Sequence, residues 1–272
     1  MIIDLSAAIN EEQSGRSKTK IKRVPPHKTG YYTGGMYVFQ KGLSRIQFFI
    51  RALLYVTRIK ALSGKDFMNN RGLTIQFIST STHSGTHLDA PMHMGYQHNG
   101  SGEYSIDKVP LEWCYNDGVL LDFSKNAPRT ITVEHIEEKL KETNTKLKPF
   151  DIVIFNTGAS EYRSTDRYFE DYPAISPDSV TYLYEKGIRI FGTDAWGIDP
   201  PGAPEISKYL KSNRKGNLFP AHMKGMKLDI IHMEQMSNLN QIPNNQKFKV
   251  ACFPVKILGG DAAWCRAVAI TN

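Results

Sequence analysis

The segment from His83 to His93 constrains this chain more than any other part of it. It reads His-Ser-Gly-Thr-His-Leu-Asp-Ala-Pro-Met-His and holds three of the eight histidines in a chain of 272 residues, together with a carboxylate. Imidazole nitrogen and carboxylate oxygen are the usual protein ligands of zinc, manganese and iron. Histidines scattered on a polar surface loop would be the simpler interpretation, but this clustering favours a metal site.

The residues around the segment support convergence of these side chains. Residues 73–79 alternate apolar and polar side chains, which predicts a strand that leads into the segment. Gly85 permits a sharp turn between His83 and His87. We therefore expect the two imidazoles to approach each other.

The second half of the segment is expected to be extended. His87 and Asp89 are two residues apart, so an extended backbone points both side chains to one face. Pro91 disfavours a helix, which would leave His93 on the same face. The sequence thus predicts four polar side chains around one small volume.

A second source of ligands lies between residues 221 and 234. His232 and Glu234 are two apart and could share one face of a strand. His222 and Glu234 would need a bend between them. Spacing alone leaves open whether His222 or His232 is the ligand.

Strand and helix patterns alternate along the whole chain, without an internal repeat or a linker. We expect a long loop at 10–35, helices at about 42–62, 132–142 and 177–187, and strands at 1–6, 118–123, 151–156, 188–193, 248–255 and 263–270. Ser176 followed by Pro177 is a typical helix start, and Gly187 is a natural stop. These patterns indicate one α/β domain over residues 1–272.

Residues at about 30–71 form an extended segment that is strongly apolar and aromatic. Its helix at about 42–62 has a broad apolar face, which favours packing over a pocket or a partner subunit, with a membrane surface as the less ordinary alternative. Tyr32 and Phe39 are candidates to line a substrate pocket, or they pin a loop. Trp196 follows a strand, where α/β proteins place binding residues, although a core position is equally compatible.

The net charge of +7 raises the question of nucleic-acid binding. The basic residues are scattered, however, with only modest clusters at 18–23 and 208–215 that lack interleaved aromatic residues. We expect no nucleic-acid partner, and a basic surface that attracts an anionic substrate.

The chain has no run of eighteen apolar residues and no signal-peptide pattern at its start, so we expect no membrane span and a cytoplasmic location. Cys114, Cys252 and Cys265 lack CxxC spacing, which indicates reduced and mostly buried thiols.

Residues 83–93 match the motif HxGTHxDxPxH, and by this motif the chain resembles the metal-dependent cyclase and kynurenine formamidase family. That family includes isatin hydrolases and polyketide cyclases. Residues 1–6, 151–158, 175–199 and 248–270 resemble further parts of it. The resemblance implies an α/β fold of the swivelling β/β/α type, with a mixed sheet and flanking helices, in a homodimer or homotetramer.

The resemblance also implies a ligand set. His83 and His87 would bind one ion, His222 a second, and Asp89 and Glu234 would bridge the two. Members like isatin hydrolase hold a single manganese, so one or two ions of zinc or manganese are expected. His93 would be the catalytic acid/base, and His232 a neighbour rather than a ligand. The length of the segment at 30–71 and the stretch at 194–197 differ from the family pattern, where substrate selection is expected.

These residues predict a metal-dependent hydrolase of an amide, lactam or lactone bond in an aromatic small molecule. The metal would activate water and polarise the carbonyl, while His93 moves the proton. The alternative is a polyketide cyclase, in which the same parts acidify an α-carbon and close a ring by aldol condensation. A third possibility is a metal- or RNA-binding protein without turnover.

Overall fold

Two sets of elements make up the chain in the computed structural model, which describes residues 1–11, 19–59, 61–68, 70–94, 104–225, 228–243 and 246–271. Residues 1–18 and 81–272 form one compact unit, here the sheet unit, and residues 19–80 form a second, here the small unit. The sequence indicated one domain with an apolar segment at about 30–71, and that segment falls inside the small unit. No helix in the described part of the chain is long and apolar enough to cross a membrane.

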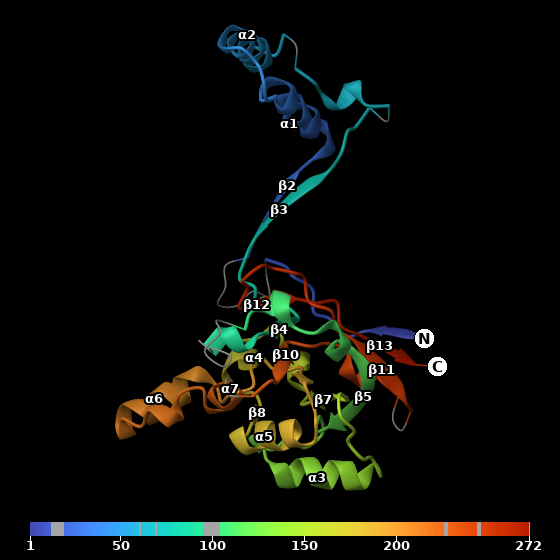
Figure 1. Cartoon of the computed structure of the whole chain (residues 1–272), viewed down its shortest axis with the longest axis vertical. Coiled ribbons are helices and arrows are strands. Elements are labelled where there is room, and N and C mark those ends of the chain that lie inside the picture. Colours follow the sequence, from blue (N-terminus) through green and yellow to red (C-terminus); the bar gives the residue numbers. More distant parts are fainter. Residues whose placement is uncertain are drawn as a thin grey trace. The chain divides into compact units, whose positions relative to one another are not determined.

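A mixed sheet is the centre of the sheet unit (Figure 1). Within the described residues its strands are, in spatial order, β1 (Ile2–Asp4), β13 (Val268–Thr271), β11 (Phe248–Ala251), β5 (Tyr115–Asp122), β7 (Ile152–Asn156), β9 (Ile190–Thr193), β10 (Ile231–Glu234), β4 (His87–Asp89) and β12 (Ala262–Trp264). The central run β5-β7-β9-β10 is parallel, and the strands on either side of it are antiparallel.

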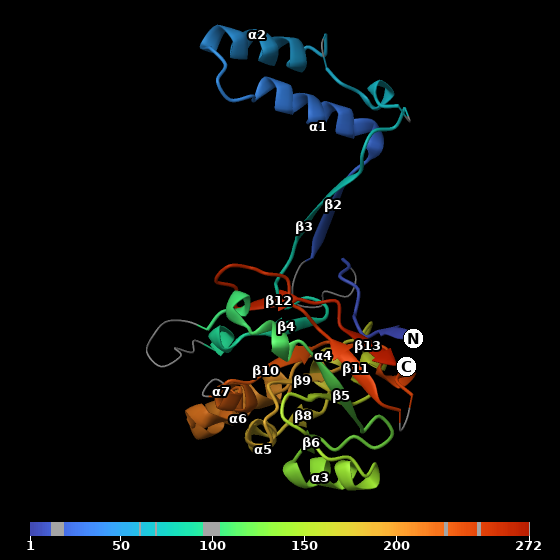
Figure 2. The same ribbon diagram turned by 45° about the vertical axis from the view of Figure 1, so that its right-hand side comes forward.

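Helices flank this sheet (Figure 2). They are α3 (Val133–Glu142), α4 (Arg167–Glu170), α5 (Pro177–Glu185), α6 (Gly202–Ser212) and α7 (Pro220–Gly225), and a two-stranded sheet pairs β6 (Thr130–Ile131) with β8 (Ala174–Ile175). The predicted fold class, a mixed sheet with flanking helices, is confirmed.

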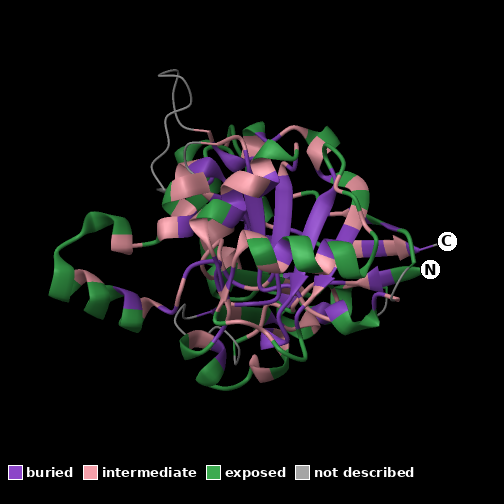
Figure 3. Ribbon diagram, turned by 90° about the horizontal axis from the view of Figure 1, so that it is seen from below, coloured by how far each residue is buried: buried purple, intermediate pink, exposed green. Residues whose placement is uncertain are grey.

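Both faces of the central strands β7, β9 and β10 are buried (Figure 3). Along β7, Ile152 and Ile154 enter one apolar core, while Val153 and Phe155 enter a second core beneath α3 and α5. A strand with two buried faces needs a continuous apolar run, which is what residues 152–155 carry.

The helix signals in the sequence correspond to real helix ends. The Ser176 hydroxyl accepts the backbone N–H of Ser179 at 3.1 Å, and Pro177 occupies the first turn of α5. Gly187 follows the helix with φ of 84°. The predictions of α3 and α5 are therefore confirmed.

The small unit contains a strand pair and two helices. Strands β2 (Lys20–Val24) and β3 (Ile75–Ser79) pair antiparallel, and α1 (Pro26–Val38) and α2 (Arg45–Val56) lie between them in sequence. Helix α2 confirms the prediction at about 42–62 and begins with a reciprocal capping box between Ser44 and Gln47. The structure describes α2 from end to end, and none of its residues is buried within the small unit.

The prediction of a long loop at 10–35 is wrong. Residues 12–18 lie outside the described part of the chain, but β2 and most of α1 fall within the interval. The glycines of α1 made this stretch resemble a loop in the sequence. A Cβ on Gly30 would lie 2.4 Å from the backbone of Ser63, and one on Gly34 would lie 3.1 Å from the Tyr55 ring. These glycines therefore allow close packing of a helix and do not break it.

The single strand predicted at 263–270 is also wrong, because it is two strands in different parts of the sheet. Strand β12 pairs with β4, whereas β13 pairs with β11 and β1. The chain between them crosses from one region of the sheet to another, and a local apolar pattern does not reveal such a crossing.

Candidate metal centre

The candidate ligands meet because β4 and β10 are neighbours in the sheet. The two strands pair antiparallel, with His232 opposite Asp89 and Glu234 opposite His87. Residues two apart on a strand share a face, so all four polar side chains lie on one side of the sheet. Leu88, between the two β4 residues, points to the apolar core on the other side.

The turn before β4 is held by hydrogen bonds to β10 and to the N-terminal segment. Gly85 has φ of 72°, as the predicted sharp turn requires. The Thr86 hydroxyl donates to the backbone carbonyl of Gln235 at 2.7 Å and accepts the N–H of Ala7 at 2.8 Å. The Gln235 side chain donates to the carbonyl of His83 at 2.9 Å. This network fixes where His83 stands relative to β10.

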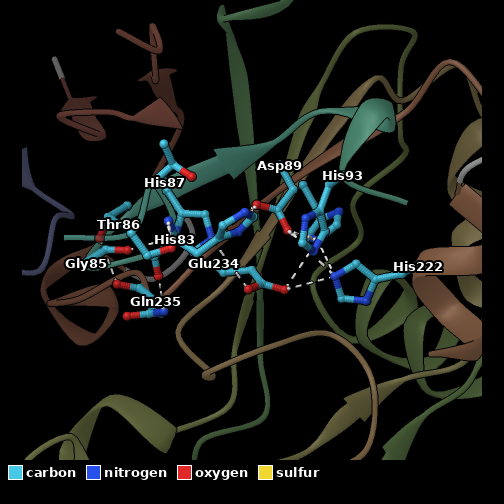
Figure 4. Close-up of polar contacts among 12 residues, drawn as sticks. His83, Gly85, Thr86, His87, Asp89, His93, His222, Glu234 and Gln235 are labelled. Carbon is cyan, nitrogen blue, oxygen red and sulfur yellow. Dashed lines mark hydrogen bonds and ion pairs between the residues drawn. The ribbon is translucent and has the colours of Figure 1, made fainter. Parts of the chain in front are cut away.

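A first group of donor atoms gathers around one oxygen of Asp89 (Figure 4). His83 Nδ1 lies 2.9 Å from Asp89 Oδ1, and His87 Nε2 lies 3.1 Å from the same oxygen. Glu234 Oε2 is 3.6 Å from His87 Nε2. The segment predicted as a metal site therefore does bring its first three candidate ligands together.

A second group gathers around the other oxygens of the same two carboxylates. His222 Nε2, on α7, lies 3.6 Å from Asp89 Oδ2 and 3.5 Å from Glu234 Oε1. His232 Nε2 lies 3.3 Å from each of these oxygens. Each carboxylate thus turns one oxygen toward each group, which is the arrangement expected of residues that bridge two ions. The ligand roles themselves stay predictions.

The imidazoles of three candidate ligands are oriented by hydrogen bonds on their far side. His87 Nδ1 donates to the carbonyl of Gly85 at 2.8 Å, His83 Nε2 to Asp261 at 3.1 Å, and His222 Nδ1 to Asp199 at 2.5 Å. A metal-binding histidine commonly donates its other ring N–H in this way, which leaves the nitrogen that faces the site free to bind.

Asp199 and Asp261 were not predicted as site residues. Asp199 also accepts the backbone N–H groups of Ala221 and His222, so it fixes the start of α7. Asp261 immediately precedes β12, and the antiparallel pairing of β12 with β4 brings it to the site. Both contacts arise from strand and helix placement, for which the local sequence carries no signal.

The buried polar atoms of the site fit a cation. Within the described part of the chain, His87 Nε2, both oxygens of Asp89 and Glu234 Oε1 are buried and have no hydrogen bond of normal geometry. Such an atom costs about 1–3 kcal/mol if it is left unpaired. A divalent cation would give all of them a partner, and the mixed nitrogen and oxygen donors suit zinc or manganese.

The electrostatics of the site also favour positive charge. Burial raises the pKa of Asp89, but the His87 imidazole and the other imidazoles outweigh it and hold this pKa well below its usual range. Burial lowers the pKa of His222, but its contacts with Asp199 and Asp89 outweigh it and raise this pKa to about 10. Without a cation, protonated histidine side chains neutralise the negative charge of the buried carboxylates.

His93 differs from the candidate ligands in exposure and in backbone. Its side chain is 31% exposed, whereas that of His87 is fully buried. The expected extended backbone is wrong here, because residues 91–94 form a 3-10 turn in which the N–H of His93 donates to Ala90. Pro91 opens this turn at a position where its missing N–H costs nothing.

The imidazole of His93 nevertheless reaches the site. His93 Nε2 is 3.9 Å from Asp89 Oδ2, too far for a hydrogen bond. Burial and the imidazoles of His83 and His222 lower the pKa of His93, against the opposing effect of Asp89. A neutral imidazole at neutral pH can accept a proton. His83, His93 and Asp261 also form a third group of possible ligands, which is more exposed than the other two.

A cavity adjoins the second group. Its polar end is formed by Asp89, His93, His222 and His232, and its wall is mostly apolar and includes Val180, Phe191, Ile198 and Ile230. A cavity with one polar end and an apolar wall suits a small molecule with an apolar body.

Of the three predicted substrate residues, Trp196 belongs to the sheet unit and Tyr32 and Phe39 belong to the small unit. Trp196 packs edge-to-face on Phe169 at 4.7 Å and on Tyr168, and it is not among the described residues that line the cavity. Tyr32 lies on α1 and Phe39 directly after it, both exposed within the small unit. Their roles in substrate binding stay predictions.

The sequence is similar to a family of cyclases and to kynurenine formamidases. A family model described as “Putative cyclase” matches residues 3–200. Kynurenine formamidase from Salinibacter ruber is 29% identical over 188 residues, which cover 69% of this chain and 76% of that protein.

Solved structures share the fold. Isatin hydrolase A from Labrenzia aggregata, bound to benzyl benzoate, superposes with a TM-score of 0.68 at 21% identity, and the match covers 100% of this chain and 94% of that one. A potential metal-dependent hydrolase with cyclase activity superposes with a TM-score of 0.61 at 19% identity, covering 100% of this chain and 98% of that one. Identities this low show a common fold.

Proposed function

This chain belongs to the cyclase family, and on this basis we propose that it is a metal-dependent hydrolase. The bond that it cleaves would be an amide, lactam or lactone bond in an aromatic small molecule. It is an enzyme, a hydrolase or a cyclase. The observation that carries the proposal is the division of the Asp89 and Glu234 oxygens between two groups of imidazoles at one end of a cavity.

His83 and His87 would hold one ion and His222 a second, and Asp89 and Glu234 would contribute to both. A divalent cation, zinc or manganese, would polarise a substrate carbonyl and lower the pKa of water at this site. The surrounding protein excludes bulk water from the carboxylates, since Asp89 and Glu234 are buried.

His93 would move the proton. It stands at the edge of the site and lines the cavity, so its imidazole can accept a proton from the attacking water and deliver it to the leaving nitrogen or oxygen. The lowered pKa of His93 favours the neutral form that this first step needs.

The substrate class is inferred from the cavity and from the relatives. Its apolar wall suits a flat aromatic body, and its polar end receives the reactive carbonyl. The names of two similar proteins, kynurenine formamidase and isatin hydrolase, support an amide or lactam attached to an aromatic ring.

A cyclase is the second candidate, and the family description favours it. In this reaction His93 would remove a proton from the α-carbon of a polarised carbonyl, and the resulting enolate would attack a second carbonyl of the same molecule. A polyketide or another molecule with several carbonyl groups is the substrate class that this chemistry requires.

The test separates the two reactions by their products. Purified protein loaded with zinc or manganese is given an N-formyl arylamine, an aromatic lactam, an aromatic lactone and a polyketone, and the products are identified by mass spectrometry. We expect addition of one water and release of an acid from at least one of the first three. Conversion of the polyketone alone, with loss of water, would replace the hydrolase proposal by the cyclase.

His93→Ala tests the proton transfer. We expect kcat on the best substrate to fall by roughly 10²–10⁴, with metal content unchanged. His135→Gln is the matched control, because His135 lies on α3 and a glutamine at that position preserves the capping box with Thr132. An alanine variant with unchanged kcat would rule out the role of His93.

A further inference from the structure

The ligand set implied by the family resemblance does not include His232, but in the structure His232 lies in the same group of possible ligands as Asp89, His222 and Glu234. We propose that His232 is a fourth protein ligand of the second ion, together with Asp89, His222 and Glu234, so that this site is closed by protein atoms alone. The inference rests on the metal-dependent function proposed above, but it concerns the binding of metal and not the choice of substrate.

The position of His232 is set by the sheet. It lies directly opposite Asp89 across the β4–β10 pair and shares a strand face with Glu234. Its ring is buried and stacks on Phe191 of the neighbouring strand β9, with centroids 5.6 Å apart and planes 25° apart. The imidazole is therefore held toward the carboxylates by both neighbouring strands.

The distances between the donor atoms match those around a single small cation. His232 Nε2 is 3.3 Å from Asp89 Oδ2, 3.3 Å from Glu234 Oε1 and 3.2 Å from His222 Nε2. His222 Nε2 is 3.6 and 3.5 Å from the same two oxygens. Ligands that lie about 2.0–2.1 Å from zinc in a tetrahedron are about 3.3–3.4 Å from one another.

Hydrogen bonding supports the same assignment. In its neutral form His222 donates its Nδ1 proton to Asp199, so its Nε2 lone pair then faces His232 Nε2. Two facing lone pairs repel unless a proton or a cation lies between them. A proton shared by the two rings would still leave Asp89 Oδ2 and Glu234 Oε1 without a hydrogen bond, as they are within the described residues. A cation satisfies all four atoms.

The inference completes the protein ligands of the second ion. Zinc sites with four protein ligands are typically structural, whereas catalytic sites have three protein ligands and one open position. Asp89, His222, His232 and Glu234 supply four ligand atoms. The second ion would therefore hold the two buried carboxylates in place.

The test uses two variants that remove the imidazole in different ways. His232→Phe keeps an aromatic ring for stacking on Phe191, and His232→Gln keeps a polar side chain. Metal content and affinity are measured by equilibrium dialysis against chelator-buffered zinc, with His135→Gln as control. We expect two ions per chain in the wild type and in the control. In both His232 variants one of the two ions should lose more than about tenfold in affinity while the other stays bound, since even residues that only support a ligand have effects of 10- to 100-fold.

Cobalt provides a readout that a folding defect does not imitate. The visible absorption of bound Co²⁺ depends on the number and kind of its ligands, so loss of the His232 imidazole should change the band that filling of the second site gives, in both variants and not in the control. Retained binding of the first ion shows that the variants are folded. Unchanged affinity and spectrum in both variants, or an equal loss of both ions, would overturn the proposal.

Failure of this inference is distinguishable from failure of the proposed function. A wild type that binds a single ion and hydrolyses an aromatic amide refutes the four-ligand site and leaves the hydrolase intact. A wild type that binds two ions, only one of which depends on His232, but hydrolyses none of the substrates supports the four-ligand site and refutes the hydrolase.

Discussion

Asp199 is the residue on which the orientation of His222 depends. One carboxylate accepts the N–H of Ala221 at 2.6 Å, the N–H of His222 at 3.1 Å and the ring Nδ1–H of His222 at 2.5 Å. It therefore fixes both the start of α7 and the ring nitrogen that faces the other ligands. The same side chain joins a local structural role to a role in metal binding.

Asp199→Asn separates these roles. Asparagine keeps one oxygen for a backbone N–H of α7, but it cannot accept all three hydrogen bonds and its amide group repels the ring N–H. We expect the affinity for the second ion to fall about 10- to 100-fold, measured by chelator competition. Asp178→Asn, an exposed change on α5, is the control. Wild-type affinity in the Asp199 variant would contradict the argument.

The sequence predicted the part of the site that is local. His83, His87 and Asp89 share one short segment whose turn and strand can be deduced from Gly85 and from spacing. The choice between His222 and His232 could not be made, because it depends on the register of β10 against β4. In the structure the imidazoles of both His222 and His232 lie close to the same oxygens of Asp89 and Glu234, so both residues are near enough to be ligands.

At the scale of elements, the sequence was most informative where an element carries its own signals. Helix α5 has a serine cap, a proline in its first turn and a glycine stop, and β7 is a continuous apolar run. Helix α1 shares only the proline in the first turn, and its glycines are explained only by the distant backbone of Ser63 and the ring of Tyr55. The crossing between β12 and β13 was missed for the same reason.

Gly118 on β5 gives a test of close packing within the sheet. It lies opposite Phe248 of β11, and a Cβ at this position would be 2.1 Å from the Phe248 ring. We expect Gly118→Ala to lower the free energy of unfolding by about 1–3 kcal/mol, measured by urea denaturation. In the Phe248→Leu background the same change should cost less, because the ring that blocks the Cβ is gone. Equal costs in both backgrounds would show that the ring is not the cause.

At the scale of the whole molecule, metal and stability should be linked. A cation that binds the native site and not the unfolded chain stabilises the protein by about 2.7 kcal/mol at one hundred times its dissociation constant. We expect the melting temperature to rise on addition of zinc or manganese and to fall with chelator. Asp89→Asn should abolish most of this shift, since Asp89 contacts both groups of imidazoles. A shift that persists in that variant would mean the metal binds elsewhere.

The expected homo-oligomer, the cytoplasmic location and the absence of a nucleic-acid partner stay predictions.

The antiparallel pairing of β4 with β10 has a consequence for how the protein matures. If β10 slipped by one residue, His232 and Glu234 would exchange places with the apolar residues beside them and turn away from Asp89. Only the native alignment can then complete the second group of ligands, and an ion bound there would tie the two strands together against later slippage. We therefore expect the supply of divalent cation during synthesis to set the yield of correctly paired chains, before any substrate is met.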